Sequence, residues 1–555
     1  MRPFPEASYA GDGNSGGFFI RFYRRVLSVI RSTLRPRLTW KYLFCTGAAF
    51  YVLYCYLFSL PLFAHPLPMY TGPYQVGAID LEIPVTPPRV IDPARFKGSE
   101  QNAFELETVL FTLYYPSANE KQRHRRVHHW IPRPIRVTAE GYAKFARINS
   151  CITKPIFTGA LRAIAGSIKI PAKVDTPLAE LAVPVVSHKK GEQSPQLEKL
   201  VSIEHEGYPV IVFSHGMAST RTDYTHYAGE LASRGFVVVM LEHRDGSCPG
   251  SIIVKPGEPK KSRLTFRMTE VETPDGGALE IDDFHRAQLN FREAEIEEAV
   301  AVLRRINAGE GEEVFQQNTR NEGNGLAGWA GRLNVDEMII AGHSYGATGA
   351  LQALKGGPSE KRPFIGGIVL DPGKQSGRLN HDVRVPLLVV HSNSWSSKYS
   401  IFYGRAHFGV VKNLVEENNK RGNPSWFMTS LGTSHPSVTD APILEPTLLS
   451  WTTGAKINVY EGLRQYIHLC EDFLWFLKKG EMRHLLAEKA EFPEYDSGSG
   501  FGIWKPGQGD NAKEGGEWWD WRKYWQVHVS PVKVPDPAPA PAESLEPDTQ
   551  KVLDS

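Results

Sequence analysis

Residues Ile339–Ala350 of this chain read IIAGHSYGATGA. An apolar run ends in the pentapeptide GHSYG (342–346), and small residues follow it. Gly-x-Ser-x-Gly is typical of a nucleophilic serine on a sharp turn, but it needs a strand before it and a helix after it. Met338–Ala341 predicts that strand, and Ala347–Leu354 predicts that helix. The stretch therefore predicts Ser344 as a nucleophile rather than as an ordinary turn serine.

The two glycines of the pentapeptide have a steric reason. At such a turn, a Cβ at Gly342 or Gly346 would collide with the neighbouring strand or helix. The following Ala347, Gly349 and Ala350 are small enough for the helix to begin close to the sheet. The helix N-terminus also favours negative charge that develops during a reaction.

Continuous apolar runs elsewhere predict further strands that are buried on both faces. These runs are Val210–Phe213, Phe236–Leu241, Ile368–Leu370, Leu387–Val390 and Trp426–Thr429. Amphipathic patterns lie between them, and Arg292–Ile306 is the clearest helix. Strands that alternate with helices predict an α/β fold, a mainly parallel central sheet flanked by helices.

A serine nucleophile needs an acid and a histidine, which follow it in the order Ser, Asp or Glu, His in one large class of α/β enzymes. Asp371 ends the apolar run of GGIVLDPG, where a triad acid belongs. Asp-Pro-Gly is also good turn chemistry, so a simple turn is the alternative.

The general base is predicted as His435, in the loop SLGTSHPSVTDAP that follows a late strand. Any of the 18 histidines is an alternative on composition alone, because histidines are common on surfaces. His343, His391 and His407 are the specific rivals. His343 adjoins the serine on a tight turn, so its side chain points elsewhere, and His391 comes too early in the chain.

Backbone N–H groups are predicted to hold the oxyanion. One belongs to Tyr345, which follows the nucleophile. The other is assigned to Met217, because Val210–Phe213 leads into Ser-His-Gly-Met and Gly216 allows the backbone to turn inward. An ordinary strand-to-helix turn is the alternative interpretation of this His-Gly pair.

Composition limits the class of function. The 555 residues include 41% apolar and 22% charged residues, which indicates a large packed core. The net charge of +2 gives no argument for nucleic acid. The five cysteines show no CxxC pairing, so neither a disulfide framework nor a zinc site is predicted. We expect no metal, no cofactor and no obligate protein partner.

The N-terminal segment predicts a membrane anchor. Residues 1–41 contain seven arginines and one lysine, and we expect them to form a basic, partly disordered arm. Residues 42–64 follow without a charge and are long enough to cross about 30 Å of hydrocarbon. A buried helix and a cleaved signal peptide are the alternatives. The arginine excess predicts a single-pass protein with a cytosolic N-terminus. The absence of an Asn-x-Ser/Thr sequon argues mildly against a lumenal main domain.

The remaining chain divides by composition. Residues 70–490 have the composition of a folded catalytic domain, interrupted by polar insertions at 187–206 and 309–334 that predict surface loops. Residues 497–555 hold a Trp-rich and then a Pro/Ala-rich tail, which we expect to be largely disordered.

Several segments in the same order resemble the plasma and intracellular type-II platelet-activating-factor acetylhydrolases. These segments are GPYQVGAIDLE (72–82), LFTLYYP (110–116), PVIVFSHGMASTRTDYTHYAGELASRGFVVVMLEHRDGS (209–247), GHSYGA and GGIVLD. The resemblance covers roughly residues 70–480. It implies an α/β-hydrolase fold and the catalytic triad Ser344, Asp371 and His435, with Met217 and Tyr345 as oxyanion donors.

The resemblance also implies a function: calcium-independent hydrolysis of short or oxidised sn-2 acyl chains from phospholipids at a membrane surface. The basic, aromatic segment 121–136 is a possible bilayer contact or a solvated loop. This chain departs from the family where Pro372-Gly373 replaces an aromatic after the acid, and in HPSVTD (435–440). A general carboxylesterase or lipase, and a catalytically silent membrane adaptor, remain the alternatives.

Overall fold

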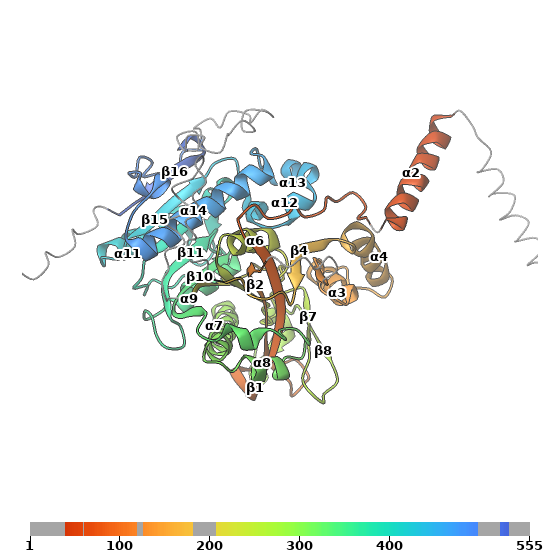
Figure 1. Ribbon diagram of the computed structural model, residues 1–555, viewed down its shortest axis with the longest axis horizontal. Coiled ribbons are helices and arrows are strands. Elements are labelled where there is room, and N and C mark those ends of the chain that lie inside the picture. Colours follow the sequence, from red (N-terminus) through yellow and green to blue (C-terminus); the bar gives the residue numbers. More distant parts are fainter. Residues whose placement is uncertain (1–38, 59, 119–125, 181–206, 498–521, 532–555) are drawn as a thin grey trace, which may run out of the picture. The chain divides into compact units, whose positions relative to one another are not determined.

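The computed structural model describes residues 39–58, 60–118, 126–180, 207–497 and 522–531 (Figure 1). The chain divides into two compact units, Met1–Leu62 and Phe63–Ser555. The second unit contains the main sheet and every residue of the predicted triad.

Helix α2 (Trp40–Leu57) is the described element of the first unit. It begins after Thr39, whose hydroxyl accepts a hydrogen bond from the Tyr42 N–H. The helix ends at Leu57, before the end of the apolar run predicted to cross the membrane at 42–64. Among the described residues, no helix combines the length and the apolar character that crossing a bilayer requires. Most of the predicted basic arm lies outside the described residues.

The main sheet has 12 strands and is parallel at its centre. Along the sheet the order is β16 (Trp525–Val529), β15 (Ser425–Ser430), β12 (Leu387–Ser392), β11 (Phe364–Leu370), β10 (Leu333–His343), β5 (Tyr208–Ser214), β6 (Val237–Leu241), β2 (Asn102–Ser117), β1 (Gln75–Phe96), β4 (Lys169–Val174) and β3 (Val127–His129), and β9 (Val271–Glu272) pairs with β1. The strands from β15 to β6 are mutually parallel, whereas β2 runs antiparallel to both of its neighbours. The predicted α/β fold with a mainly parallel sheet is therefore confirmed.

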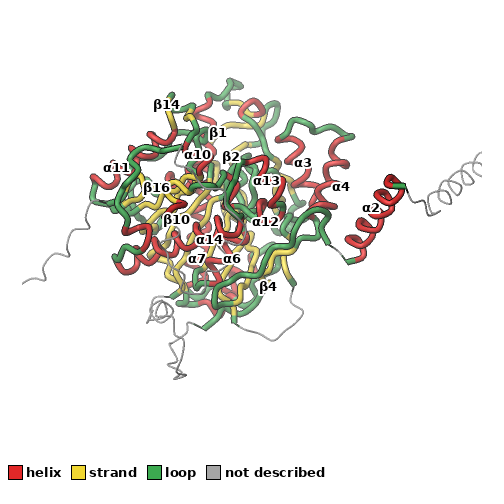
Figure 2. The backbone as a smooth tube through the Cα atoms, turned by 90° about the horizontal axis from the view of Figure 1, so that it is seen from above, coloured by secondary structure: helices red, strands yellow, loops and turns green. Residues whose placement is uncertain are grey.

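Two apolar layers cover the sheet, one on each face. Alternate residues of β5 divide between them: Val210 and Val212 join the first layer, and Ile211 and Phe213 join the second. The first layer contains helices α7 (Ile281–Asn307), α9 (Tyr345–Ala353) and α11 (His407–Lys420). The second contains α6 (Thr225–Ser233) and α14 (Val459–Lys479). Figure 2 shows strands in the interior of this unit with helices around them. Burial on both faces explains why these strands are continuous apolar runs.

The strand register brings the predicted site to one edge of the sheet. Gly342 lies opposite Ser214, and His343 lies opposite Leu370. Leu370 in turn lies opposite Val390 on the next strand. The carboxyl ends of neighbouring parallel strands meet at this edge, which is where open α/β sheets bind ligands.

The shorter elements connect these layers. They are α3 (Ile135–Phe145), α4 (Thr153–Ala165), α8 (Gly311–Gln317), α10 (Asn393–Ser396), α12 (Ala441–Leu444), α13 (Pro446–Thr453), the hairpins β7 (Gly250–Ile253) with β8 (Lys261–Leu264) and β13 (Tyr399–Ser400) with β14 (Arg405–Ala406), and the 3₁₀ turns η1 (Met268–Glu270), η2 (Leu326–Trp329), η3 (His435–Val438), η4 (His484–Ala487) and η6 (Arg522–Tyr524).

Two sequence predictions need correction. The segment 309–334 is not simply a surface loop, because α8 and η2 form within it and bury Val314, Leu326 and Trp329 in the first apolar layer. The tail after residue 497 is not wholly irregular, because β16 pairs antiparallel with β15. Its sequence WQVHV alternates apolar and polar residues, which suits a strand. The strand was not predicted because it is short and lies between a Trp-rich and a Pro/Ala-rich segment. The second polar insertion, 187–206, lies outside the described residues.

Candidate active site

Ser344 sits on a strained turn between β10 and α9. Its backbone has φ 58° and ψ −120°, in a region that non-glycine residues rarely adopt. An added Cβ at Gly346 would lie 1.9 Å from the Ser214 carbonyl oxygen, and one at Gly342 would lie 2.2 Å from the Gly346 carbonyl oxygen. Both glycines are therefore sterically required, as the sequence predicted. The turn lifts the serine hydroxyl out of the sheet.

The structure brings Ser344, His435 and Asp371 together in the order that the chemistry needs. The Ser344 Oγ lies 3.0 Å from His435 Nε2. The His435 Nδ1 lies 2.8 Å from Asp371 Oδ2. The tautomer with a proton on Nδ1 satisfies both contacts, because Nδ1 then donates to the carboxylate and Nε2 accepts from the hydroxyl. The arrangement has the geometry of a proton relay from serine to histidine, held by a carboxylate.

The Asp371 carboxylate is buried and held by several donors. It lies at the end of β11, and its backbone φ of 49° marks a strained position. The Ser392 N–H donates to Oδ1 at 2.5 Å, and the Ser392 hydroxyl donates to Oδ2 at 2.6 Å. With His435 these donors fix the direction of the carboxylate. Such contacts favour the role of triad acid over that of a simple turn residue.

The plane of the His435 ring is fixed by a residue that the sequence did not reveal. The Trp395 ring of α10 stacks on it, with centroids 3.9 Å apart and planes 9° apart. The Trp395 indole N–H donates to the Pro372 carbonyl at 2.9 Å. The Ser394 hydroxyl accepts the His435 backbone N–H at 3.0 Å. Trp395 therefore places an aromatic ring beside the triad, although Pro372 stands where the family tends to have one.

The three rival histidines lie in other environments. His343 is buried, its Nδ1 lies 2.9 Å from the Tyr224 hydroxyl, and burial lowers its pKa well below the usual value. Burial also lowers the pKa of His391 and of His407. His407 donates through Nε2 to the Pro372 carbonyl at 2.8 Å. The hydrogen bond to Ser344 belongs to His435.

The two predicted oxyanion donors belong to segments that adjoin Ser344, and their role stays a prediction. Tyr345 is the first residue of α9, where a helix has backbone N–H groups without an intrahelical acceptor. An added Cβ at Gly216 would lie 3.1 Å from the Ser344 Cβ, so the residue before Met217 approaches the serine closely. Two backbone N–H groups on either side of a serine are the arrangement that holds a tetrahedral oxyanion.

A second Ser-His-acid cluster lies beneath the strained turn that carries Ser344. No role was assigned to it from the sequence. The Ser214 Oγ lies 2.7 Å from His243 Nε2, and His243 Nδ1 lies 2.6 Å from Glu295 Oε2. His243 belongs to the EHRD segment, whereas Glu295 comes from α7. All three side chains are buried. Burial lowers the pKa of His243 and raises the pKa of Glu295, each well away from its usual value.

Arg292 lies next to this buried cluster. Its guanidinium is fully buried and forms an ion pair with Asp245, with Nε 2.8 Å from Oδ2. It also donates to the Ser214 hydroxyl at 3.2 Å and to the His215 carbonyl at 2.7 Å. A buried arginine is stable only with such partners, because an unpaired charge in the interior is very costly.

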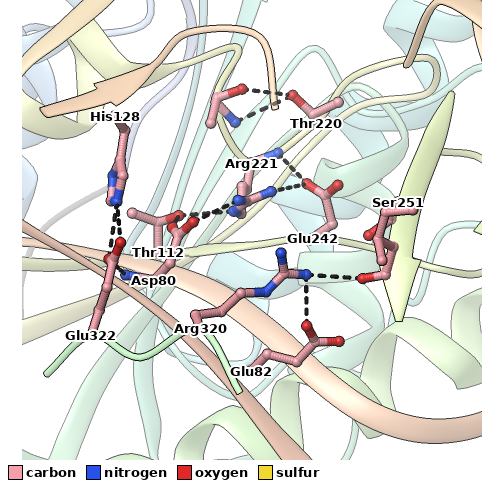
Figure 3. Close-up of polar contacts among 12 residues, drawn as sticks. Asp80, Glu82, Thr112, His128, Thr220, Arg221, Glu242, Ser251, Arg320 and Glu322 are labelled. Atoms are coloured by element: carbon pink, nitrogen blue, oxygen red, sulfur yellow. Dashed lines mark hydrogen bonds and ion pairs between the residues drawn. The ribbon is translucent and has the colours of Figure 1, made fainter. Parts of the chain in front are cut away.

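Three groups of metal-binding side chains occur among the described residues, and in the first of them the donor atoms already have protein partners. Asp80, His128 and Glu322 form one group (Figure 3). His128 Nε2 lies 3.0 Å from both Glu322 oxygens, and Arg221 donates to Asp80 at 2.7 Å. Burial alone would raise the pKa of Asp80, but Arg221, His128 and Thr112 together outweigh it and hold that pKa well below its usual range.

A second such group, His215 with Glu242 and Cys248, is fully buried. Burial raises the pKa of the Cys248 thiol well above its usual value, whereas a metal ligand must be a thiolate. The third group contains His343 with the triad residues Asp371 and His435. The donor sets therefore fit a metal poorly, and the absence of a metal requirement stays a prediction.

Comparison with known proteins places these residues in a family. Residues 63–490 match the family described as platelet-activating factor acetylhydrolase, isoform II. The platelet-activating factor acetylhydrolase of Cavia porcellus is 27% identical over 55% of this chain and 55% of its own length. The alignment thus spans about half of that relative. The Gallus gallus protein of the same name is 24% identical over 78% of this chain and 86% of its own length.

Among solved structures, a ferulic acid esterase from Streptomyces cinnamoneus matches 77% of this chain and 97% of its own. Its TM-score is 0.45 and its sequence identity is 14%.

Proposed function

Because this chain belongs to the platelet-activating factor acetylhydrolase isoform II family, we propose that it hydrolyses the sn-2 acetyl, short or oxidised acyl ester of phospholipids without calcium. The observation that carries the proposal is the relay from Ser344 through His435 to Asp371, on a strained strand-to-helix turn. The relay supports ester hydrolysis through an acyl-enzyme, and the family match supports a phospholipid as the substrate.

The reaction has two steps. His435 Nε2 takes the hydroxyl proton of Ser344 while Oγ attacks the sn-2 ester carbonyl. The oxyanion accepts hydrogen bonds from the backbone N–H groups of Met217 and Tyr345. The histidine returns its proton to the departing lyso-phospholipid oxygen, and the acyl group stays on Ser344. Water then gives a proton to His435 and attacks the acyl-enzyme, which releases the fatty acid and restores the serine.

An exposed apolar surface supports contact with a membrane. Helix α4 exposes Ile156 and Ile164, with relative exposures of 66% and 46%, and the loop before it exposes Ile152 at 70%. Exposed Arg147 and Arg162 accompany these side chains. Apolar side chains together with arginines suit the surface of an anionic bilayer. The isoleucine side chains insert among the lipid chains, and the arginine guanidinium groups bind the lipid phosphates. This surface gives the enzyme access to a substrate that stays in the lipid.

The uncharged run 42–64 supports an additional, N-terminal membrane anchor with its N-terminus in the cytosol. Fractionation of cells that express the full chain or a chain starting at Phe63 tests this part. The full chain should remain with membranes after an alkaline carbonate wash. Its complete release by that wash would contradict an anchor.

The substrate proposal is tested with purified protein on three esters: 1-alkyl-2-acetyl-glycerophosphocholine, its long-chain sn-2 analogue and p-nitrophenyl acetate, each with and without EDTA. We expect kcat/KM for the acetyl phospholipid to exceed that for the long-chain lipid by at least about 100-fold, since a pocket that admits short chains excludes long ones. EDTA should leave the rate of hydrolysis of each ester unchanged. Ser344→Ala is the control for contaminating esterases. Hydrolysis of the aryl ester alone would identify a general carboxylesterase instead.

A further inference from the structure

In the loop after β5, the backbone N–H groups on either side of Met217 donate hydrogen bonds to other described residues, whereas the Met217 N–H does not. The Gly216 N–H donates to the Tyr224 hydroxyl at 3.2 Å. The Ala218 N–H donates to the Ser247 carbonyl at 2.8 Å. Ala218 has a φ of 58°, a conformation that a residue other than glycine adopts only when its surroundings impose it. Within the described part of the chain, no protein group accepts the N–H of Met217.

The His215 side chain fixes the peptide group that carries the Met217 N–H. Its Nδ1 donates to the Gly216 carbonyl at 2.8 Å. Its Nε2 accepts the backbone N–H of His243 at 3.1 Å. Only the neutral ring with its proton on Nδ1 satisfies both contacts. In a trans peptide, the Gly216 carbonyl and the Met217 N–H point in opposite directions. Holding this carbonyl on one side therefore aims the N–H to the other side.

Arg292 contacts both halves of the predicted oxyanion hole from below. On one side it donates to the His215 carbonyl at 2.7 Å and to the Ser247 hydroxyl at 2.6 Å. On the other side its guanidinium carbon lies 4.5 Å from the centre of the Tyr345 ring. The same side chain thus touches His215, which lies two residues before Met217, and Ser247, whose carbonyl accepts the Ala218 N–H. It also touches Tyr345, which carries the second predicted donor. Arg292 is anchored in turn by its ion pair with Asp245.

We propose that Arg292 and His215 are positioning residues that hold the oxyanion hole in its working geometry before substrate binds. The inference rests on the proposed function, because an oxyanion hole has a role only if Ser344 attacks an ester. Neither side chain touches the reacting atoms. Their contribution is that the two N–H groups need no rearrangement when charge develops on the carbonyl oxygen, which is where oxyanion holes gain most of their effect.

The other arginines of this region are anchored elsewhere. Arg221 lies six residues after His215 in the chain, and its backbone N–H donates to Glu242 while its guanidinium donates to Asp80 and Thr112 (Figure 3). Arg244 is as buried as Arg292 and pairs with Glu82, with Nη2 2.7 Å from Oε1. The Arg244 side chain bonds to Thr108, Ser251 and Ile252 instead of the residues around the oxyanion donors, so it is a matched control for the loss of a buried guanidinium.

The test uses the full chain and p-nitrophenyl acetate, an ester that does not depend on the lipid preference. His215→Asn keeps an amide N–H near the place of Nδ1, whereas His215→Leu removes it. Arg292→Lys is compared with Arg244→Lys. Each variant is assayed for kcat, KM, thermal unfolding temperature and inhibition by an aryl trifluoromethyl ketone. That ketone adds the Ser344 Oγ at its carbonyl carbon, His435 takes the proton, and the resulting oxyanion occupies the hole.

We expect His215→Leu and Arg292→Lys to lower kcat by about 10- to 100-fold, below the 10²- to 10³-fold effect of removing a donor outright. KM should change by less than about threefold, because a positioning effect acts on the transition state. The ketone Ki should rise by the same factor as kcat falls. His215→Asn should recover most of the loss, and Arg244→Lys should lower the unfolding temperature without this loss of kcat.

Equal kcat values for Arg292→Lys and Arg244→Lys, or a loss of kcat without a matching rise in the ketone Ki, would overturn the proposal. If His215→Leu does not fold, His215→Gln replaces it, since its longer amide matches Nε2 rather than Nδ1. Recovery by His215→Gln as good as by His215→Asn would then also contradict the inference. A wild-type protein that hydrolyses none of the esters would refute the proposed function instead, so the two failures are distinguishable.

Discussion

Two Ser-His-acid clusters lie one beneath the other in this chain. In the upper cluster, Ser344 is 3.0 Å from His435, which is 2.8 Å from Asp371. In the lower cluster, Ser214 is 2.7 Å from His243, whose other nitrogen is 2.6 Å from Glu295. By hydrogen-bond distance alone, the lower cluster would be the better relay.

The difference between the clusters lies in their surroundings. Ser344 has a strained backbone with φ 58°. The His435 side chain has a relative solvent exposure of 30%. Ser214 belongs to a regular strand, and neither it nor His243 is exposed to solvent. Only the upper serine is flanked by the two predicted oxyanion donors. Residue types at the right distances therefore do not identify a nucleophile, whereas access, backbone strain and oxyanion donors do.

The largest expected contrast is between the two serines. Ser344→Ala should lower kcat by about 10⁴-fold or more, because it removes the attacking atom. Ser214→Ala should lower kcat by less than about tenfold. It should cost roughly 1–3 kcal/mol of unfolding free energy, since it leaves a buried histidine nitrogen without its partner. Ester hydrolysis and urea unfolding of both variants measure the contrast. A greater loss of kcat in Ser214→Ala would reverse the assignment of the clusters.

The two acids should differ next. Asp371→Asn should lower kcat by about 10³- to 10⁴-fold, because the amide no longer stabilises the protonated histidine or its working tautomer. Burial raises the pKa of Glu295 well above its usual value, which favours the neutral carboxyl that glutamine imitates. Glu295→Gln should therefore change kcat by less than about threefold. Steady-state rates of both variants provide the measurement, and a comparable loss in the two would contradict the different roles assigned to the two acids.

The buried side of the comparison also predicts a pH effect on stability. Burial, with help from Arg292, lowers the pKa of His215 from 6.5 to about 4. As pH falls below 6.5, His215 becomes protonated in the unfolded chain but stays neutral in the folded chain. The free energy of unfolding therefore decreases between about pH 6.5 and pH 4. His215→Asn removes this titration. From pH 7 to pH 5, the wild type should lose about 2 kcal/mol more unfolding free energy than the variant. Urea unfolding at both pH values tests this, and identical pH dependence would argue against a buried neutral ring.

The smallest expected effect concerns Trp395, which stacks on His435, the predicted general base, and belongs to the upper cluster. Trp395→Ala should lower kcat by about two- to twelvefold, the factor that corresponds to the roughly 0.5–1.5 kcal/mol of an aromatic pair. Trp395→Phe should retain most of the rate, because a ring still restrains His435. Comparison of kcat for the two variants measures the effect. A Phe variant as impaired as the Ala variant would assign the role to the indole N–H bond with Pro372 instead.

The central strands and the order of the triad could be predicted from the sequence because they are local features. The runs that end at Phe213, Ala341 and Leu370 are continuous and apolar, and each precedes a residue of the site. The glycines of the turn at Ser344 were predictable from the pentapeptide itself, although the atom that a Cβ at Gly346 would meet belongs to Ser214, which is remote in the chain. The catalytic roles of Ser344, Asp371 and His435 stay predictions until they are measured.

Features that depend on contacts between distant segments could not be predicted. Arg292 reaches the carbonyl of His215, which lies far away in the sequence, and no local pattern distinguishes it from the surface arginines of the same helix. Trp395 meets His435 only after two strand-to-loop connections fold against each other. Strand β16 lies in a tail whose composition suggests disorder, and its partner β15 is remote in the chain.

Labelling with a fluorophosphonate, followed by mapping of the modified peptide, tests the central claim most directly. The phosphonate reacts with a serine only where a base, access and an oxyanion site occur together. The account predicts that Ser344 is the one modified residue. Ser214 should stay unmodified, although its hydrogen bond to His243 is shorter than that of Ser344 to His435. Modification at Ser214, or no modification of the folded protein, would contradict it.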